Sequence, residues 1–218
     1  LTAFATRFAE KRPFFLEGSQ LFSINHPNFY YSRRIGARPS GTATGDFVDY
    51  PQDATILAAV KITGRLQSKT SVGVQTAVTG EESASIASLG VPGSTKIRVA
   101  PRAYYGLGRV RQEFGALGST VGFLVNAMHR DLTDGEPLAN LLTTNALAGA
   151  GDTLLRFKGG EYEFRAVVGG SIVTGTDEAI TRVQRTSSHY AQRPDRTYSP
   201  LATTLTSRMI SSGVYSNE

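Results

Sequence analysis

The sequence has no cysteine among its 218 residues. This absence excludes disulfide scaffolds, zinc sites built from thiolates and cysteine nucleophiles. No apolar run approaches the roughly 18 residues of a membrane-spanning helix, which excludes helical spanning but leaves a β-barrel open, because lipid-facing residues of barrel strands alternate with polar ones. Charged residues are only 19% of the chain, while Gly, Thr, Ser and aromatic residues are abundant. Such a composition is typical of β-sheet proteins rather than of disordered chains.

Patterns that carry catalysis or hold metals are also missing. The histidines His26, His129 and His189 have no second histidine at a spacing that suits a metal ion. The sequence contains no G-x-S-x-G elbow, and the adjacent acids Glu81 and Glu82 lie in a Ser-rich stretch typical of a solvated loop. The sequence therefore predicts no metal site, no cofactor and no catalytic residue.

The net charge of +5 is carried mostly by arginine. The basic residues are spread along the chain and are not gathered with stacking aromatic residues. Since a nucleic-acid site would need a clustered basic face, we expect no nucleic-acid partner.

The clearest pattern lies in residues 119–132, STVGFLVNAMHRDL. Every second residue from Val121 to Ala127 is apolar, and the other face includes Asn126 and Arg130. This alternation predicts a strand with one apolar and one mixed face. A strand of about ten to twelve residues is roughly twice the usual length in soluble domains and suits a tilted crossing of a bilayer.

Similar segments recur from Thr55 onward, and the connections between them alternate in length. We expect strands at 55–66, 70–79, 97–114, 119–132, 141–157, 161–174 and 199–215. The connections are short at 67–69, 115–118 and 158–160 and long at 80–96, 131–140 and 175–200, the last with a helical segment at 178–192. Outer-membrane barrels combine short turns on one side with long loops on the other.

One expected strand, 97–114, changes phase. Arg98 and Arg102 share one parity, but Arg109 and Arg111 fall on the parity that is apolar earlier in the strand. Either the strand leaves the apolar zone there, or a bulge shifts its phase.

The predicted fold class is all-β, an antiparallel up-and-down meander of long strands that forms part of a transmembrane β-barrel, with a short helical segment in the last long loop. Residues 1–54 are expected to form a loop or plug with one short strand at 29–36, and residues 55–218 the barrel wall. Six or seven strands are visible, whereas such barrels begin at about eight. Because the chain also starts without a signal peptide and stops in mid-pattern, we expect a fragment.

The mixed face supplies the candidate functional residues, because it would line the lumen if the apolar face meets lipid. The lumen-facing candidates are Lys61, Arg65, Gln75, Arg98, Arg102, Asn126, Arg130, Asp152, Arg156, Glu163 and Arg165. The N-terminal plug candidates are Glu10, Lys11, Arg12, Glu17, Arg33 and Arg34. They could line a transport path or only stabilise the interior through ion pairs.

Several segments resemble a family of uncharacterised Gram-negative envelope proteins. They are EKRPFFLEG at 10–18, FYYSRRIG at 29–36, VDYPQDATILAAVKITGR at 48–65, RDL at 130–132 and EAITRVQRTSSHYAQRPD at 178–195. The resemblance implies an outer-membrane β-barrel that often follows a domain similar to family-nine carbohydrate-binding modules. It implies no catalytic residues.

The expected function is therefore that of a non-enzymatic protein of the cell outer membrane, in contact with lipid. A channel, a transport component and a platform for a glycan-handling domain are the candidate roles, with glycans or the carbohydrate-binding-like domain as partners. Two alternatives remain open: a soluble β-sheet binding module and an envelope-associated carbohydrate-active hydrolase. The direction of the apolar face separates the first alternative from the barrel.

Overall fold

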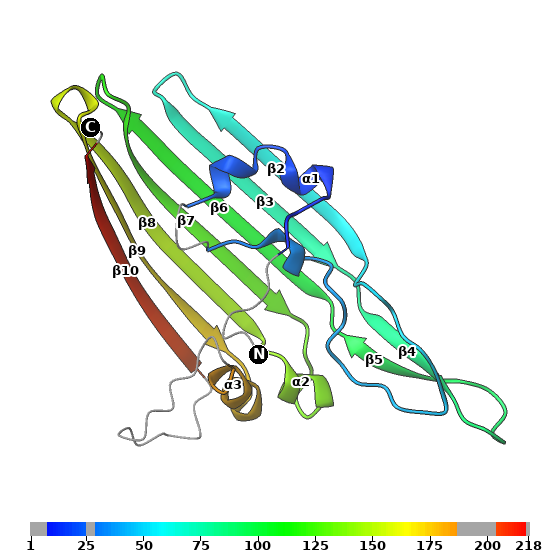
Figure 1. Ribbon diagram of the computed structural model, residues 1–218. Helices are drawn as coiled ribbons and strands as arrows, with labels where there is room; N and C mark the ends of the chain where they lie inside the picture. The colour runs from blue at the N-terminus through cyan, green and yellow to red at the C-terminus, as the bar shows by residue number, and fades with distance from the viewer. Residues whose placement is uncertain (1–7, 25–28, 187–203, 217–218) are drawn as a thin grey trace, which may run out of the picture.

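The computed structural model of the protein describes residues 8–24, 29–186 and 204–216, the last range as backbone only. Most of this chain forms antiparallel β-sheet, arranged in one large and one small sheet (Figure 1). The large sheet has seven strands in the order β10-β9-β8-β7-β6-β3-β2, and the small sheet has three in the order β1-β4-β5. The predicted antiparallel meander is confirmed, with one excursion into the small sheet between β3 and β6.

The strands of the large sheet are ten to thirteen residues long. They are β2 (Ile56–Arg65), β3 (Thr70–Thr79), β6 (Ala103–Phe114), β7 (Ser119–Arg130), β8 (Asn145–Phe157), β9 (Tyr162–Thr174) and β10 (Thr204–Ser216). The small sheet holds β1 (Phe47–Asp49), β4 (Glu82–Ala87) and β5 (Thr95–Ala100). The helices are α1 (Pro13–Leu16), α2 (Pro137–Leu141) and α3 (Asp177–Gln184), with 3-10 turns η1 (Ser19–Phe22), η2 (Ser32–Arg34) and η3 (Lys158–Gly160).

Among the described residues, no helix has the length and apolar character needed to cross a membrane.

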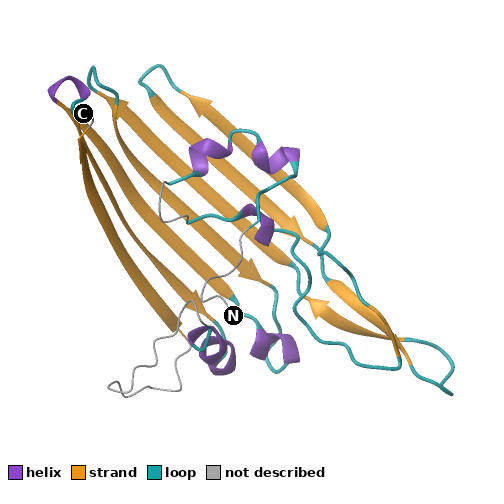
Figure 2. Ribbon diagram, viewed as in Figure 1, coloured by secondary structure: helices purple, strands orange, loops and turns teal. Residues whose placement is uncertain are grey.

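Tight turns gather at one end of the large sheet and long connections at the other (Figure 2). The β6–β7 turn needs glycine, because Gly115 and Gly118 both adopt positive φ, 70° and 67°. The opposite end carries the β4–β5 hairpin, α2 and α3. Thr176 caps α3 by accepting a 3.3 Å hydrogen bond from the Ala179 amide. The helix ends at Gln184, so the predicted helix at 178–192 is wrong for residues 185 and 186. Its remaining residues, 187–192, lie outside the described residues.

Three local predictions are wrong. The expected strand 97–114 is interrupted at Pro101, because β5 belongs to the small sheet and β6 to the large one. Proline has no backbone N–H to donate to a neighbouring strand, so the break falls there. The expected loop 80–96 contains β4, and the expected strand 29–36 is instead the 3-10 turn η2 with extended flanks.

The two faces of the large sheet have opposite character. The first, here called the open face, exposes apolar side chains: Ile62 is 70% exposed, Val74 54% and Phe123 58%. The second, here called the covered face, mixes polar side chains with apolar ones such as Leu107 and Leu124, and its polar residues Gln75 and Arg109 are only 3% and 2% exposed.

The N-terminal segment, defined as residues 8–24 and 29–46, lies across this face as far as η2 and then runs beside the small sheet, where the Gly41 amide donates to the Val99 carbonyl at 2.9 Å (Figure 1). Two hydrophobic clusters lie between the segment and the sheet. Further buried apolar residues, among them Val99, Leu138 and Ile180, lie in the small sheet, α2 and α3.

The two outer strands of the large sheet are β2 and β10. Each pairs with one neighbour, β3 and β9 respectively, and the described strands do not close on themselves. The sheet is therefore an open, curved wall.

Candidate functional site

The covered face holds the N-terminal segment through side chains that bind its backbone. Lys61 on β2 donates to the carbonyls of Phe14 and Glu17. Arg109 Nε on β6 donates to the Leu21 carbonyl at 3.2 Å, and Asn126 Nδ2 on β7 to the Phe29 carbonyl at 3.2 Å. Gln75 on β3 donates to the Tyr30 hydroxyl. Four strands thus fix the path of the segment with hydrogen bonds whose donors are mostly charged or amide groups.

Aromatic side chains of the segment fill sockets where the sheet has glycine. Phe22 packs against Leu107 and Leu124, in a cluster that Phe29 and Tyr30 border. A Cβ added at Gly73 would lie 2.8 Å from the Phe22 ring, and one at Gly169 would lie 2.5 Å from the Phe29 ring. These glycines are needed for close approach, since real Cβ contacts are longer.

Gly73→Ala is expected to weaken the docking of the N-terminal segment by about 1–3 kcal/mol, because overpacking displaces Phe22. Trypsin cleavage after the exposed Lys11 should become roughly tenfold faster for each 1.4 kcal/mol of docking free energy that is lost. The reason is that the cleavage rate follows the population of molecules whose segment has come off the sheet. The control is Gly64→Ala on β2, where an added Cβ meets nothing within 4 Å. Equal cleavage rates in both variants would contradict the inference that Phe22 needs a glycine at position 73.

A second feature braces the segment against itself. Arg12 pairs with Glu10 at 2.7 Å and donates to the carbonyls of Ile35 at 2.7 Å and Ser32 at 3.0 Å. The Ser32 hydroxyl donates to Glu10 at 2.6 Å. Phe15, which follows in α1, is 5% exposed, lies under the Arg12 guanidinium at 4.2 Å and packs with Ile35. The EKRPF motif therefore ties the start of the segment to η2.

These bonds perturb the titration of the groups involved. Hydrogen bonding to the Arg12 guanidinium, helped by the Ser32 hydroxyl and two backbone amides and opposed by burial, holds the pKa of Glu10 far below its ordinary value of 4.5. The same pair raises the pKa of Arg12. Burial raises the pKa of the Tyr30 hydroxyl, against the hydrogen bond from Gln75.

Glu10→Gln is expected to lower the free energy of unfolding by about 1–2 kcal/mol at pH 7, because it removes a charge-assisted hydrogen-bond acceptor. A carboxyl with a lowered folded-state pKa contributes stability above its unfolded pKa and loses it as the pH falls. The difference between wild type and variant should therefore shrink progressively below pH 4.5. Denaturant titrations at pH 7 and pH 3 measure it, with the exposed Glu17→Gln as control. A difference that does not shrink between pH 7 and pH 3 would show that the charge is not the cause.

Ion pairs stiffen the covered face toward the tight-turn end. Arg109 makes a bidentate pair with Asp152 on β8, with 2.9 Å between Nη2 and Oδ2. It crosses β7 over Gly122, where a Cβ would lie 2.7 Å from Arg109 Nη1. Glu163 on β9 accepts from both Arg156 and Arg165. These contacts link strands β6, β8 and β9 across the face.

A cavity of about 570 Å³ lies between the segment and the long-connection end of the covered face. Tyr30, Tyr31 and Arg34 line it from the segment, and Tyr105 and Arg130 from the sheet. Its volume lies within the range of small-molecule sites. It is the best-formed candidate for a binding site.

The structure brings most lumen-facing candidates to the covered face. Those on it are Lys61, Arg65, Gln75, Asn126, Arg130, Asp152, Arg156, Glu163 and Arg165. Arg98 and Arg102 are not there, because the break at Pro101 puts Arg98 in β5 and Arg102 in the connection to β6. Arg98 pairs with Glu81 and Glu136 instead, and Arg102 is exposed.

The plug candidates divide by role. Glu10 and Arg12 form the brace, and Arg33 donates to the Ala9 carbonyl at 3.0 Å. Arg34 lines the cavity. The side chains of Lys11 and Glu17 are exposed and take no part in the described interior.

Sequence reasoning missed Arg109, the most buried charged residue described, and the aromatic residue Tyr105. Both lie on the covered face because β6 begins at Ala103, which restores an unbroken alternation through Tyr105, Leu107 and Arg109. Pro101 was the signal that could have revealed this phase.

Metal chemistry gains no support from the described residues, which contain no group of three or more acidic or histidine side chains placed to hold an ion. His129 lies exposed at the end of β7, with Nδ1 2.7 Å from the Asn145 amide oxygen and Nε2 3.4 Å from Asp131. His26 and His189 lie outside the described residues.

Comparison with known proteins places the chain in a family. No curated protein and no solved structure matches it significantly. Residues 1–137, more than half of the 218, match the family described as Domain of unknown function (DUF5916). This range contains the N-terminal segment, the small sheet and β2 to β7. The chain therefore belongs to the DUF5916 family, whose function is unknown.

Proposed function

We propose that this chain forms part of the wall of an outer-membrane β-barrel and acts there without catalysis. The observation that carries the proposal is the inverted burial of the large sheet. Along β3, Gly73, Gln75 and Ala77 are buried while Val74 is 54% exposed. A soluble sheet buries its apolar face, whereas a barrel wall presents that face to lipid.

The exposed apolar residues form one continuous surface. They lie on neighbouring strands and include Val60, Ile62, Val74, Val110, Val121, Phe123, Leu147, Val168 and Ile172. Several are direct cross-strand partners, as Ile62 with Val74 and Val110 with Phe123. Monomeric soluble proteins rarely leave a patch of this extent in water. Lipid is the partner whose chemistry suits it.

Two further features support a barrel wall. The tight turns gather at one end and the long connections at the other, which is the pattern of outer-membrane barrels. The outer strands β2 and β10 each leave one edge for pairing, and unpaired edges in lipid would cost several kcal/mol per group. We infer that further strands join these edges.

The N-terminal segment favours a plugged wall over an open channel. Phe22 and Phe29 lie against the middle strands of the covered face, and Lys61, Arg109 and Asn126 hold the backbone there. If a carbohydrate-binding-like domain precedes this segment, as the resemblance of its motifs implies, the barrel would serve as an anchor for a glycan-handling domain.

The test is the location and gel behaviour of the full-length protein. It should sediment with the outer membrane, need detergent for extraction and migrate differently in gel electrophoresis before and after heating. A protein that stays in solution without detergent would overturn the proposal and favour a soluble β-sheet binding module.

A further inference from the structure

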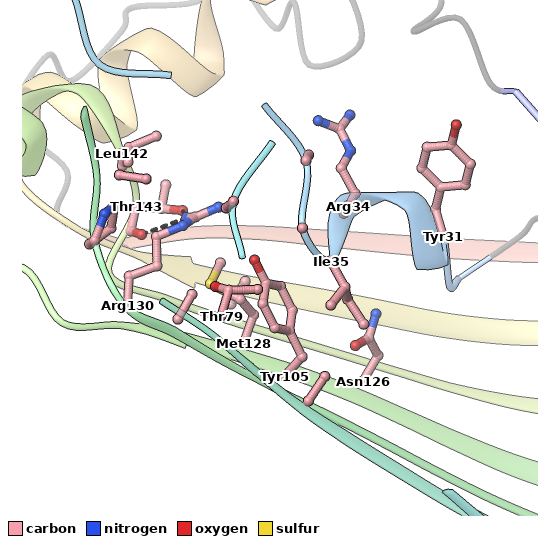
Figure 3. Close-up of a pocket in the computed structure, with 18 of the residues that line it drawn as sticks. Tyr31, Arg34, Ile35, Thr79, Tyr105, Asn126, Met128, Arg130, Leu142 and Thr143 are labelled. Atoms are coloured by element: carbon pink, nitrogen blue, oxygen red, sulfur yellow. Dashed lines mark hydrogen bonds between the residues drawn. The ribbon is translucent and has the colours of Figure 1, made fainter. Parts of the chain in front are cut away.

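The cavity between the N-terminal segment and the sheet has an unusual charge balance. Among the residues that the structure describes, its lining includes Arg34, Arg38 and Arg130 and no aspartate or glutamate. Arg38 lies over the Tyr50 ring at 5.2 Å. Arg34 comes from η2, and its side chain points away from the sheet (Figure 3). A cavity with cations and no acid in its wall is complementary to an anion.

Arg130 is the central group. It rises from the end of β7 into the cavity and donates from Nη1 to the Thr143 carbonyl at 2.8 Å and hydroxyl at 3.0 Å (Figure 3). Both acceptors are neutral, and no carboxylate pairs with Arg130 in the part of the chain that the structure describes. Arg109, by contrast, has Asp152 as its partner on the same face. Arg130 is partly exposed, and a partly desolvated cation without a counter-ion favours a negative charge beside it.

The other residues that line the cavity indicate what kind of anion would fit it. Ala103, Met128 and Ala146 form an apolar part of the lining, here called the apolar floor. The Tyr105 ring lies near Thr79 and Met128 (Figure 3). Asn126 and Gln75 add amides at the inner end. A compact, fully hydrated ion such as phosphate would leave the apolar floor unused. A planar carboxylate attached to a small ring or aliphatic body would meet both parts, because guanidinium groups bind carboxylates through parallel hydrogen bonds.

We propose that this cavity binds a small organic anion, with Arg130 holding its carboxylate and the apolar floor its body. The inference does not depend on where the protein resides, since it rests on the cavity alone.

The test is binding of defined probes to the full chain, measured by calorimetry and by the shift in the melting temperature. The charged probes are benzoate and D-glucuronate, the neutral counterparts benzamide and D-glucose, and inorganic phosphate is the compact anion. We expect a carboxylate to bind and raise the melting temperature while its neutral counterpart does not. Arg130→Gln should weaken that binding at least tenfold, which is the usual scale for one buried charge-assisted contact.

The matched control is Arg102→Gln, since Arg102 is an exposed arginine next to Pro101 and Ala103 that does not line the cavity. Its affinity for the carboxylate should equal that of wild type. If Arg130→Gln fails to fold, the exposed Arg34→Gln replaces it and should weaken binding at least threefold. The proposal is overturned if neither carboxylate binds wild type, if neutral counterparts or phosphate bind as tightly, or if the folded arginine variants of the cavity keep wild-type affinity.

Discussion

Replacing Asp152 by alanine is expected to lower the free energy of unfolding by about 3–5 kcal/mol, because it leaves a buried guanidinium without its counter-ion. The side chain of Arg109 is 1% exposed and that of Asp152 18%. Their bidentate pair spans from β6 to β8, and Arg109 also holds the Leu21 carbonyl of the N-terminal segment. Denaturant titration of the folded protein, in the detergent or buffer that keeps it monodisperse, measures the loss.

Two controls separate this effect from a general loss of charge. Glu113→Ala breaks the pair with Arg65, whose side chains are 30% and 52% exposed, and should cost at most about 1 kcal/mol. The double variant Arg109→Met with Asp152→Leu removes both charges and should recover most of the stability. If Asp152→Ala unfolds as wild type does, the pair is not the clamp that the geometry indicates.

The alternation of the long strands was readable from the sequence because each strand has one apolar face. Val74 and Gln75 are an example, because successive side chains of a strand point to opposite faces whatever surrounds them. The antiparallel meander and its tight turns followed from the same pattern and from glycines such as Gly115 and Gly118. These features are set by local chemistry, so the sequence alone predicts them.

Two features were not readable because they depend on which sheet a strand joins. Residues 97–114 look like one long alternating strand, but β5 pairs with β4 and β6 with β3. This division removes Arg98 and Arg102 from the covered face, where both were expected, and places Arg109 there instead. Pairing partners are fixed by long-range contacts that periodicity does not contain.

The position of the N-terminal segment also depends on distant residues. Its fit rests on Gly73 and Gly169, which are far from Phe22 and Phe29 in sequence and look like ordinary strand glycines. The same holds for the cavity, whose walls come from η2, β3, β6 and β7. The motif EKRPFFLEG indicated a packed charged segment, but only the structure shows that Glu10 and Arg12 form hydrogen bonds with η2 and the residue that follows it.

The proposal that lipid covers the open face can be tested by placing one arginine on that face. Val74 lies near the middle of β3, is 54% exposed and is bordered by Ile62 on β2. In a lipid-facing wall, Val74→Arg is expected to lower the free energy of unfolding by about 2–4 kcal/mol, because the charge must enter the hydrocarbon layer. On a solvated surface the same change should cost less than about 1 kcal/mol, which is the span of β-propensity.

Leu89→Arg is the matched control, since Leu89 is 75% exposed but lies in the β4–β5 turn, outside the large sheet. Both variants replace an exposed aliphatic side chain by arginine, so they differ only in the surface that receives the charge. Refolding of the full-length protein into lipid vesicles, followed by denaturant titration, should therefore show a large loss of unfolding free energy for Val74→Arg and little change for Leu89→Arg. Equal and small losses in both variants would mean that water, rather than lipid, covers the open face.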